Sequence, residues 1–158
     1  MVLVFFGDHL PYLGDNQLGY QELGSPVALA EEDREDPFSS YETPYVIWAN
    51  DAAAELLDWD RAVEALDLPQ NGTISASFLG AAVLELTGRG EQTPWFAFLN
   101  ELRRMAPVVQ KKTYMLPDGT YRRPQDPAED FPNDQQVQDA ILQWRQWSYY
   151  HLRYKEIP

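Results

Sequence analysis

The chain has 158 residues and a formal net charge of −13, because 25 acidic residues outnumber 12 Lys and Arg residues. A surface this acidic repels nucleic acid and anionic lipid, so we expect neither as a partner. Hydrophobic residues make up 44% of the chain and favour a folded core over disorder, and the absence of cysteine excludes disulfides, thiolate metal ligands and a cysteine nucleophile.

The first predicted element is a strand at residues 2–6. Its uninterrupted apolar run, Val-Leu-Val-Phe-Phe, suits a strand buried on both faces, as in a parallel sheet. Gly7 then lets the backbone turn without a Cβ penalty. Asp8 and His9 follow at the carboxyl end of the strand, which is the edge where open α/β sheets bind ligands.

Asp8 and His9 are candidate metal ligands. One carboxylate and one imidazole suit manganese, zinc or iron better than calcium, and adjacent side chains can converge at a turn. Taken alone, the dipeptide favours a simpler interpretation, an Asp that caps a turn beside a partly exposed His. Tyr12, Asp15 and Asn16 follow closely and are candidates to line a substrate cleft, although Asp and Asn are also ordinary turn residues.

The middle of the chain is predicted to contain short elements. A short helix is expected within residues 16–23, and the acidic, proline-bounded stretch 27–40 is expected to be a surface loop. A second core strand is predicted at residues 45–48, because Tyr-Val-Ile-Trp is rich in strand-forming residues. Residues 52–57 and 61–68 carry helix-forming residues with an apolar stripe.

Two longer amphipathic helices are predicted next. The first begins after a cap at Thr73 or Ser75, and Gly88 occupies the left-handed position that often follows a helix. The second has Thr93 as its cap and Pro94 as its first residue. The predicted buried stripe of the second helix is Trp95, Phe98, Leu99, Leu102 and Met105.

The C-terminal part is predicted to be a hairpin followed by a long helix. Asp118-Gly119 lies between two strand-like runs, residues 108–115 and 120–123, which is typical of a β-hairpin. A polar linker follows, and Asn133 is expected to cap the helix. Its stripe recurs every three or four residues: Val137, Ala140, Ile141, Trp144, Trp147, His151 and Tyr154. We interpret these aromatic residues and His151 as packing residues rather than as carbohydrate- or metal-binding side chains.

Three sequence blocks carry a resemblance to a known family. In order they are Phe6–Pro11, Tyr41–Asn50 and a stretch from Ile74–Gly80 into Leu84–Gly88, which read FGDHLP, YETPYVIWAN and ISASFLG leading into LELTG. The set resembles the C-terminal part of the lipoteichoic acid synthase and phosphoglycerol transferase group of the alkaline phosphatase/sulfatase superfamily. The blocks cover roughly the first two thirds of the chain, and the C-terminal helix is compatible with that family.

The resemblance implies an α/β fold. It would comprise a partial alkaline-phosphatase-like sheet with flanking helices, plus a small C-terminal antiparallel sheet packed on a long terminal helix. Residues 1–106 would be the C-terminal part of a sulfatase-like catalytic domain. Residues 107–158 would form a smaller subdomain, made of the hairpin and the long helix.

The resemblance also implies a function. In the family a divalent metal lies among an acidic residue, a nucleophilic Thr and an Asp-His pair, and Asp8 and His9 match that pair. Manganese is the foremost candidate, with magnesium and zinc as alternatives. The parent would transfer phosphoglycerol from a lipid-linked donor, or act as a sulfatase-like phosphodiesterase on a related anionic substrate. The alternative is a non-catalytic module that binds protein or glycan on a remnant of that fold.

The family's Thr and its acidic partner lie upstream of the matching segment. No catalytic residue is therefore assigned to this chain, and we expect the fragment alone to hold metal weakly and to be inactive. Met1 is expected to be a truncation boundary, because a start inside a core strand is unusual, and the upstream part of the same domain is then the expected partner. No apolar run approaches the length of a membrane span, so we expect a soluble fragment. Family precedent would anchor the parent in the cytoplasmic membrane with its catalytic domain extracellular.

Overall fold

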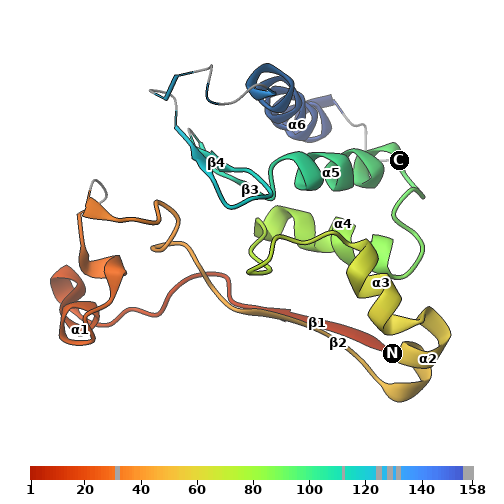
Figure 1. The fold of residues 1–158 in the computed structure, drawn as a ribbon, viewed down its shortest axis with the longest axis horizontal. Coiled ribbons are helices and arrows are strands. Elements are labelled where there is room, and N and C mark those ends of the chain that lie inside the picture. Colours follow the sequence, from red (N-terminus) through yellow and green to blue (C-terminus); the bar gives the residue numbers. More distant parts are fainter. Residues whose placement is uncertain (31–32, 112, 124–125, 128–129, 131–132, 155–158) are drawn as a thin grey trace. The chain divides into compact units, whose positions relative to one another are not determined.

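The computed structural model describes residues 1–30, 33–111, 113–123, 126–127, 130 and 133–154, with side chains as far as Trp147 in the last helix. The chain divides into two compact units, Met1–Ala53 and Ala54–Pro158, and each is described by itself (Figure 1). The described residues form a mixed α/β fold with six α-helices and two small antiparallel sheets. The predicted α/β class is confirmed at that level. The predicted boundary between residues 106 and 107 lies inside the second unit, and the domain assignment stays a prediction.

The first unit is built on a two-stranded antiparallel ribbon, in which β1 (Val2–Phe6) pairs with β2 (Tyr45–Ala49). Both strands occur where they are predicted. The interpretation of β1 as a strand of a parallel sheet, buried on both faces, is wrong for the described part of the chain. Its partner there runs antiparallel, and the side chains of Leu3 and Phe5 are exposed. An apolar run shows that both faces of a strand are apolar, but it does not show what covers them.

The segment between the two strands forms short helical turns. These are η1 (Asp15–Gln17), α1 (Leu18–Glu22) and η2 (Pro26–Ala28). The short helix expected within residues 16–23 is therefore confirmed. Farther on, the Arg34 guanidinium donates to the carbonyl oxygens of Val27 and Leu29, at 3.1 and 2.8 Å. Val27 and Phe38 are buried, so the described part of the predicted acidic loop packs around side chains of its own.

Two short helices follow β2. They are α2 (Asp51–Leu57) and α3 (Trp59–Ala65), and they match the two predicted helical segments. Asp58 separates them in a left-handed conformation, with φ of 49°. Leu66, directly after α3, is buried against the helix that follows in the chain.

Helices α4 (Ala76–Leu86) and α5 (Pro94–Met105) pack against each other in the second unit (Figure 1). The predicted cap of α5 is confirmed, because the Thr93 hydroxyl accepts from a backbone N–H of the first turn at 3.3 Å. Ser75 precedes α4 as predicted, but its hydroxyl does not cap the helix. It accepts instead from the N–H of Val109, at 2.9 Å, and so links the start of α4 to the sheet.

The second sheet has three antiparallel strands, β3 (Val108–Val109), β4 (Tyr114–Met115) and β5 (Tyr121–Arg122), in that order. The predicted hairpin is the β4–β5 pair. Its turn contains Gly119 at φ of 85°, a conformation that glycine adopts without strain. The run predicted as one strand at residues 108–115 is itself folded back, so it supplies both β3 and β4.

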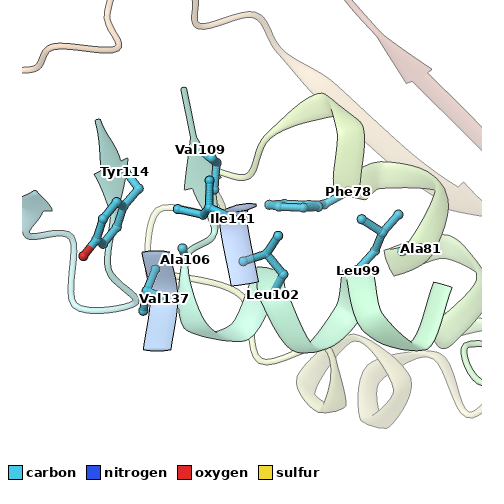
Figure 2. Close-up of a cluster of buried hydrophobic side chains, with 9 residues drawn as sticks. All are labelled: Phe78, Ala81, Leu99, Leu102, Ala106, Val109, Tyr114, Val137 and Ile141. Atoms are coloured by element: carbon cyan, nitrogen blue, oxygen red, sulfur yellow. The ribbon is translucent and has the colours of Figure 1, made fainter. Parts of the chain in front are cut away.

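The described chain ends in α6 (Asp134–Tyr154), which packs on α5 and contributes Val137 and Ile141 to the core (Figure 2). The buried core consists of Phe78, Ala81, Leu99, Leu102, Ala106, Val109, Tyr114, Val137 and Ile141. The predicted stripe of α6 is confirmed as far as Trp147, whose ring centroid lies 5.2 Å from that of Trp95. The side chains of His151 and Tyr154 lie outside the described residues. None of the described helices, α6 included, is long and apolar enough to cross a membrane.

Candidate functional site

The predicted metal ligands lie on the turn that follows β1. Gly7 is held at both of its backbone groups: its N–H donates to the Pro44 carbonyl at 3.0 Å, and its carbonyl accepts from the Thr43 hydroxyl at 2.7 Å. A Cβ on Gly7 would lie 3.0 Å from the Cβ of Thr43, closer than side chains normally approach. The end of β1 is thus fixed against the start of β2, directly before the Asp8–His9 turn.

Asp8 and His9 are both exposed, with 83% and 76% of their side-chain surfaces open to solvent. His9 Nδ1 lies 2.8 Å from the Leu10 carbonyl oxygen, and a carbonyl only accepts hydrogen bonds, so Nδ1 carries the ring proton. In the neutral ring Nε2 then keeps a free lone pair, and Nε2 lies 3.8 Å from Asp8 Oδ2. Two atoms that each lie about 2.1 Å from a shared metal are at most about 4.2 Å apart. The 3.8 Å between the carboxylate oxygen and the imidazole nitrogen lies within this limit.

The wider surroundings of the Asp8–His9 turn differ from the predicted site. Because β2 runs antiparallel to β1, the described residues do not form a parallel sheet with the turn at its carboxyl edge, and the prediction based on such an edge is not supported. Among the described residues there is no group of three or more His, Asp or Glu side chains that could hold a metal. If Asp8 and His9 bind a metal, the other ligands of its coordination shell have to come from outside the described residues.

Tyr12, Asp15 and Asn16 lie on the segment that leads into α1. The Tyr12 hydroxyl donates to Asp15 Oδ1, and this hydrogen bond raises the pKa of Tyr12. Asn16 adopts φ of 52°, and its carbonyl accepts from the Gln21 side chain at 2.9 Å. In the described part of the chain, no hydrogen bond or ion pair joins these residues to the Asp8–His9 turn. Their contacts stabilise a turn, and a role in a substrate cleft stays a prediction.

A buried polar network in the second unit is absent from the sequence-based predictions. The Arg122 guanidinium donates to both carboxylate oxygens of Asp134, through Nε and Nη2, each at 3.2 Å. The Tyr114 hydroxyl donates to the same carboxylate, and Gln138 Nε2 donates to it at 2.7 Å. The network joins β4 and β5 to the first turns of α6. The sequence does contain a signal for part of this network. Counting residues outward from the Asp118-Gly119 turn places Tyr114 opposite Arg122 in the hairpin.

The charges of this network are fixed near neutral pH. Burial raises the pKa of Asp134, but hydrogen bonds from Arg122, Tyr114 and Gln138 outweigh burial and hold that pKa below its ordinary value. The hydrogen bond to Asp134 raises the pKa of Arg122. Burial, followed by the hydrogen bond to Asp134, raises the pKa of Tyr114, so the phenol stays protonated and keeps donating. These pKa values suit a structural clamp rather than an acid–base pair that titrates.

A second buried ion pair joins α4 to α5. Arg103 is 1% exposed, and its guanidinium donates to the Leu66 carbonyl at 2.6 Å and to Glu85 Oε2 at 2.8 Å. Arg104 pairs with the other oxygen of Glu85. Both arginines also lie in the last turn of α5, where a cation favours the helix dipole. We interpret this cluster as structural, because the partners described here, Glu85 and the Leu66 carbonyl, belong to the fold.

Comparisons with known proteins identify no relative, since no family model, no curated protein and no solved structure matches this chain. The functional interpretation therefore depends on the chemistry of the side chains. Of the polar groups described above, the Asp8–His9 turn alone combines exposure with an imidazole nitrogen and a carboxylate oxygen only 3.8 Å apart. It is the candidate functional site.

Proposed function

We propose that this chain contributes an Asp-His metal pair, Asp8 and His9, to a metal-dependent phosphoglycerol transferase or sulfatase-like phosphodiesterase. The observation that carries the proposal is the geometry of the Asp8–His9 turn. The Leu10 carbonyl holds the Nδ1 proton, so Nε2 is available to a metal at 3.8 Å from Asp8 Oδ2. The three sequence blocks, in the order that the resemblance requires, support the same proposal.

In this proposal each residue of the turn has a defined task. Asp8 and His9 each supply one bond to a divalent ion, with manganese foremost, and the Leu10 carbonyl orients the imidazole ring as outer-shell partners of metal-bound His do. Gly7 keeps the turn against β2. When bound, the ion would polarise a phosphoryl oxygen and neutralise its charge. The nucleophilic Thr and the remaining ligands would come from the upstream part of the domain, which would also bind the lipid-linked donor outside the cytoplasmic membrane.

The surface of the β1–β2 ribbon supports the need for that upstream partner. The register pairs Leu3 with Trp48 and Phe5 with Val46, so the four side chains share one face of the ribbon. They are between 47% and 67% exposed. A two-stranded ribbon with an exposed apolar face is only marginally stable in water. We infer that β1 and β2 belong to a larger alkaline-phosphatase-like sheet, whose other elements cover this face.

The same face also favours the alternative function. A contiguous apolar surface is typical of a protein-docking site, and a non-catalytic module would need no metal. The two functions differ in what the Asp8–His9 turn does. Only the first requires that Asp8 and His9 bind a divalent ion together.

Manganese binding to the isotope-labelled chain tests the proposal. Mn²⁺ is paramagnetic and broadens nuclear resonances close to it, so titration should broaden the amide signals of residues 7–10 first. Asp8→Ala and His9→Ala should each abolish this selective broadening, because one remaining ligand binds weakly. Asp60→Ala, which removes an exposed carboxylate from α3, should leave it unchanged. Broadening that spreads over the acidic segments and is the same in Asp8→Ala and His9→Ala would overturn the proposal.

A further inference from the structure

A groove in the second unit lies between the β3–β4–β5 sheet and the first half of α6. Its volume is about 520 Å³, within the range of roughly 300 to 1,000 Å³ that is typical of small-molecule sites. Its lining residues come from three parts of the unit: β4 with the turn before it, the end of β5, and α6. No part of the Asp8–His9 turn contributes to this groove.

The groove concentrates positive charge on an acidic protein. Among the described residues, four Lys and Arg side chains line it, whereas one acidic side chain, that of Asp139, does so. The four cations are Lys111, Arg122, Arg123 and Arg145. Two further carboxylates lie close by, and both contact Arg122: Asp134 through hydrogen bonds, and Asp126 at 3.9 Å. Even with these three carboxylates counted, the described residues of the groove carry a net positive charge, opposite in sign to that of the whole chain.

Two of the four cations are held in place by the fold. Arg122 is clamped by Asp134, as described above. Arg145 Nη2 donates to the carbonyl oxygens of Gln110 and Lys111, at 3.1 and 2.8 Å, and so fixes the β3–β4 turn against α6. These bonds set the shape of the groove and determine where the backbone of Lys111 lies.

The other two cations have no partner among the described residues. In the part of the chain that the structure describes, the side chains of Lys111 and Arg123 form no ion pair and no hydrogen bond. Asp139, the carboxylate in the lining, already accepts from Gln135 at 2.8 Å. Lys111 and Arg123 are therefore available to an external anion. Lysine and arginine are the usual side-chain ligands of phosphate groups.

We propose that this groove binds a phosphate-bearing small molecule, with Lys111 and Arg123 as its principal contacts. Arg122 and Arg145 frame the site and add positive potential. Gln135, Gln138 and Thr113 line the remaining space and can hydrogen-bond to the hydroxyl groups of a polar ligand body. The proposal does not depend on the metal site, because the two groups of residues belong to different compact units.

Isothermal titration calorimetry on the full chain tests this assignment, with inorganic phosphate, glucose 6-phosphate and glucose as probes. We expect both phosphates to bind and glucose not to bind. Because a hydrogen bond to a charged group is lost in each case, Lys111→Gln and Arg123→Gln should each weaken phosphate binding about tenfold. Arg61→Gln is the matched control, since it removes an exposed cation of α3 outside the groove.

The outcomes separate binding in the groove from general charge attraction. Unchanged phosphate affinity in the Lys111→Gln, Arg123→Gln double variant would overturn the proposal, as would equal weakening in Arg61→Gln. Binding of glucose with the affinity of glucose 6-phosphate would show that the polar lining, not the cations, recognises the ligand, and would overturn it as well. Circular dichroism of each variant checks that the fold is intact. Loss of manganese binding in Asp8→Ala, with phosphate binding retained, would show that the two sites are independent.

Discussion

Individual side chains in this chain use charge in two ways. Asp8 and His9 are exposed, so they can exchange water for a metal ion at little desolvation cost. The Arg122–Asp134 and Arg103–Glu85 pairs are largely buried, and their desolvation is offset by partners within the fold. An exposed donor pair is suited to an external ligand, whereas a buried ion pair with partners inside the fold is suited to holding elements together.

The buried carboxylate of Asp134 should make stability depend on pH. Because its pKa is lowered in the folded chain, its contribution is present above the ordinary value of 3.8 and is lost as the pH falls through the lower, folded pKa. At neutral pH, Asp134→Asn should reduce the free energy of unfolding by about 3 kcal/mol, since the buried Arg122 loses the carboxylate that accepts two of its hydrogen bonds. That difference should shrink as the pH falls below 3.8. Urea denaturation at a series of pH values measures it.

Asp139→Asn is the matched control for this experiment. Asp139 lies on the same helix but is exposed, so its replacement should change stability little at any pH. A difference between the wild type and Asp134→Asn that stays constant from neutral to acidic pH would contradict the assigned role of the carboxylate.

Elements were more predictable from the sequence than contacts were. The caps Thr93 and Gly88 are local signals, since each depends on neighbours in the chain, and the structure bears both out, with Gly88 at φ of 72°. The partner of β1 is not a local property, and the apolar run at residues 2–6 therefore indicated a strand without indicating its antiparallel pairing. For the same reason Arg122 and Asp134, which lie 12 residues apart, were not predicted to meet.

The candidate site also combines features that local sequence predicts with features that depend on distant contacts. The residue types and the turn at Asp8 and His9 could be predicted from the sequence, because glycine after an apolar run marks the end of a strand. The proton on His9 Nδ1 could not, since it depends on where the Leu10 carbonyl lies in space. The groove between the second sheet and α6 could not be predicted from local sequence either, because its lining residues come from three separate segments of the chain.

The aromatic side of α6 should contribute measurably to stability. The ring centroid of Trp144 lies 6.3 Å from that of Phe78, and Trp144 packs against the main core. Trp144→Ala should lower the free energy of unfolding by about 3 kcal/mol, the lower end for tryptophan because the side chain is only partly buried. Gln143→Ala, at the exposed neighbouring position, should change it by less than about 0.5 kcal/mol. Equal effects of the two replacements on denaturant unfolding would show that α6 is not packed through Trp144.

The two compact units have different relations to solvent. The second unit encloses a core to which α4, α5, the sheet and α6 all contribute (Figure 2). The first unit presents an apolar face on the β1–β2 ribbon and, directly after β1, the exposed side chains of the candidate ligands Asp8 and His9. A core that is enclosed gives stability without a partner, whereas an exposed apolar face gains stability from one. The first unit is accordingly the part that we expect to be completed by further protein.

The chain alone should therefore be catalytically inactive. In the proposed function the nucleophilic Thr and the remaining metal ligands lie in the upstream part of the domain, and two ligands hold a metal too weakly to activate a nucleophile. With bis-p-nitrophenyl phosphate as a generic phosphodiester, we expect no turnover above buffer, with or without Mn²⁺. Manganese-dependent turnover by the chain that disappears in Asp8→Ala and persists in Asp60→Ala would contradict this, because it would mean that these residues complete an active site by themselves. Turnover that persists in Asp8→Ala would indicate a contaminating enzyme. In that case further purification should remove the turnover, and turnover that remains would contradict the prediction.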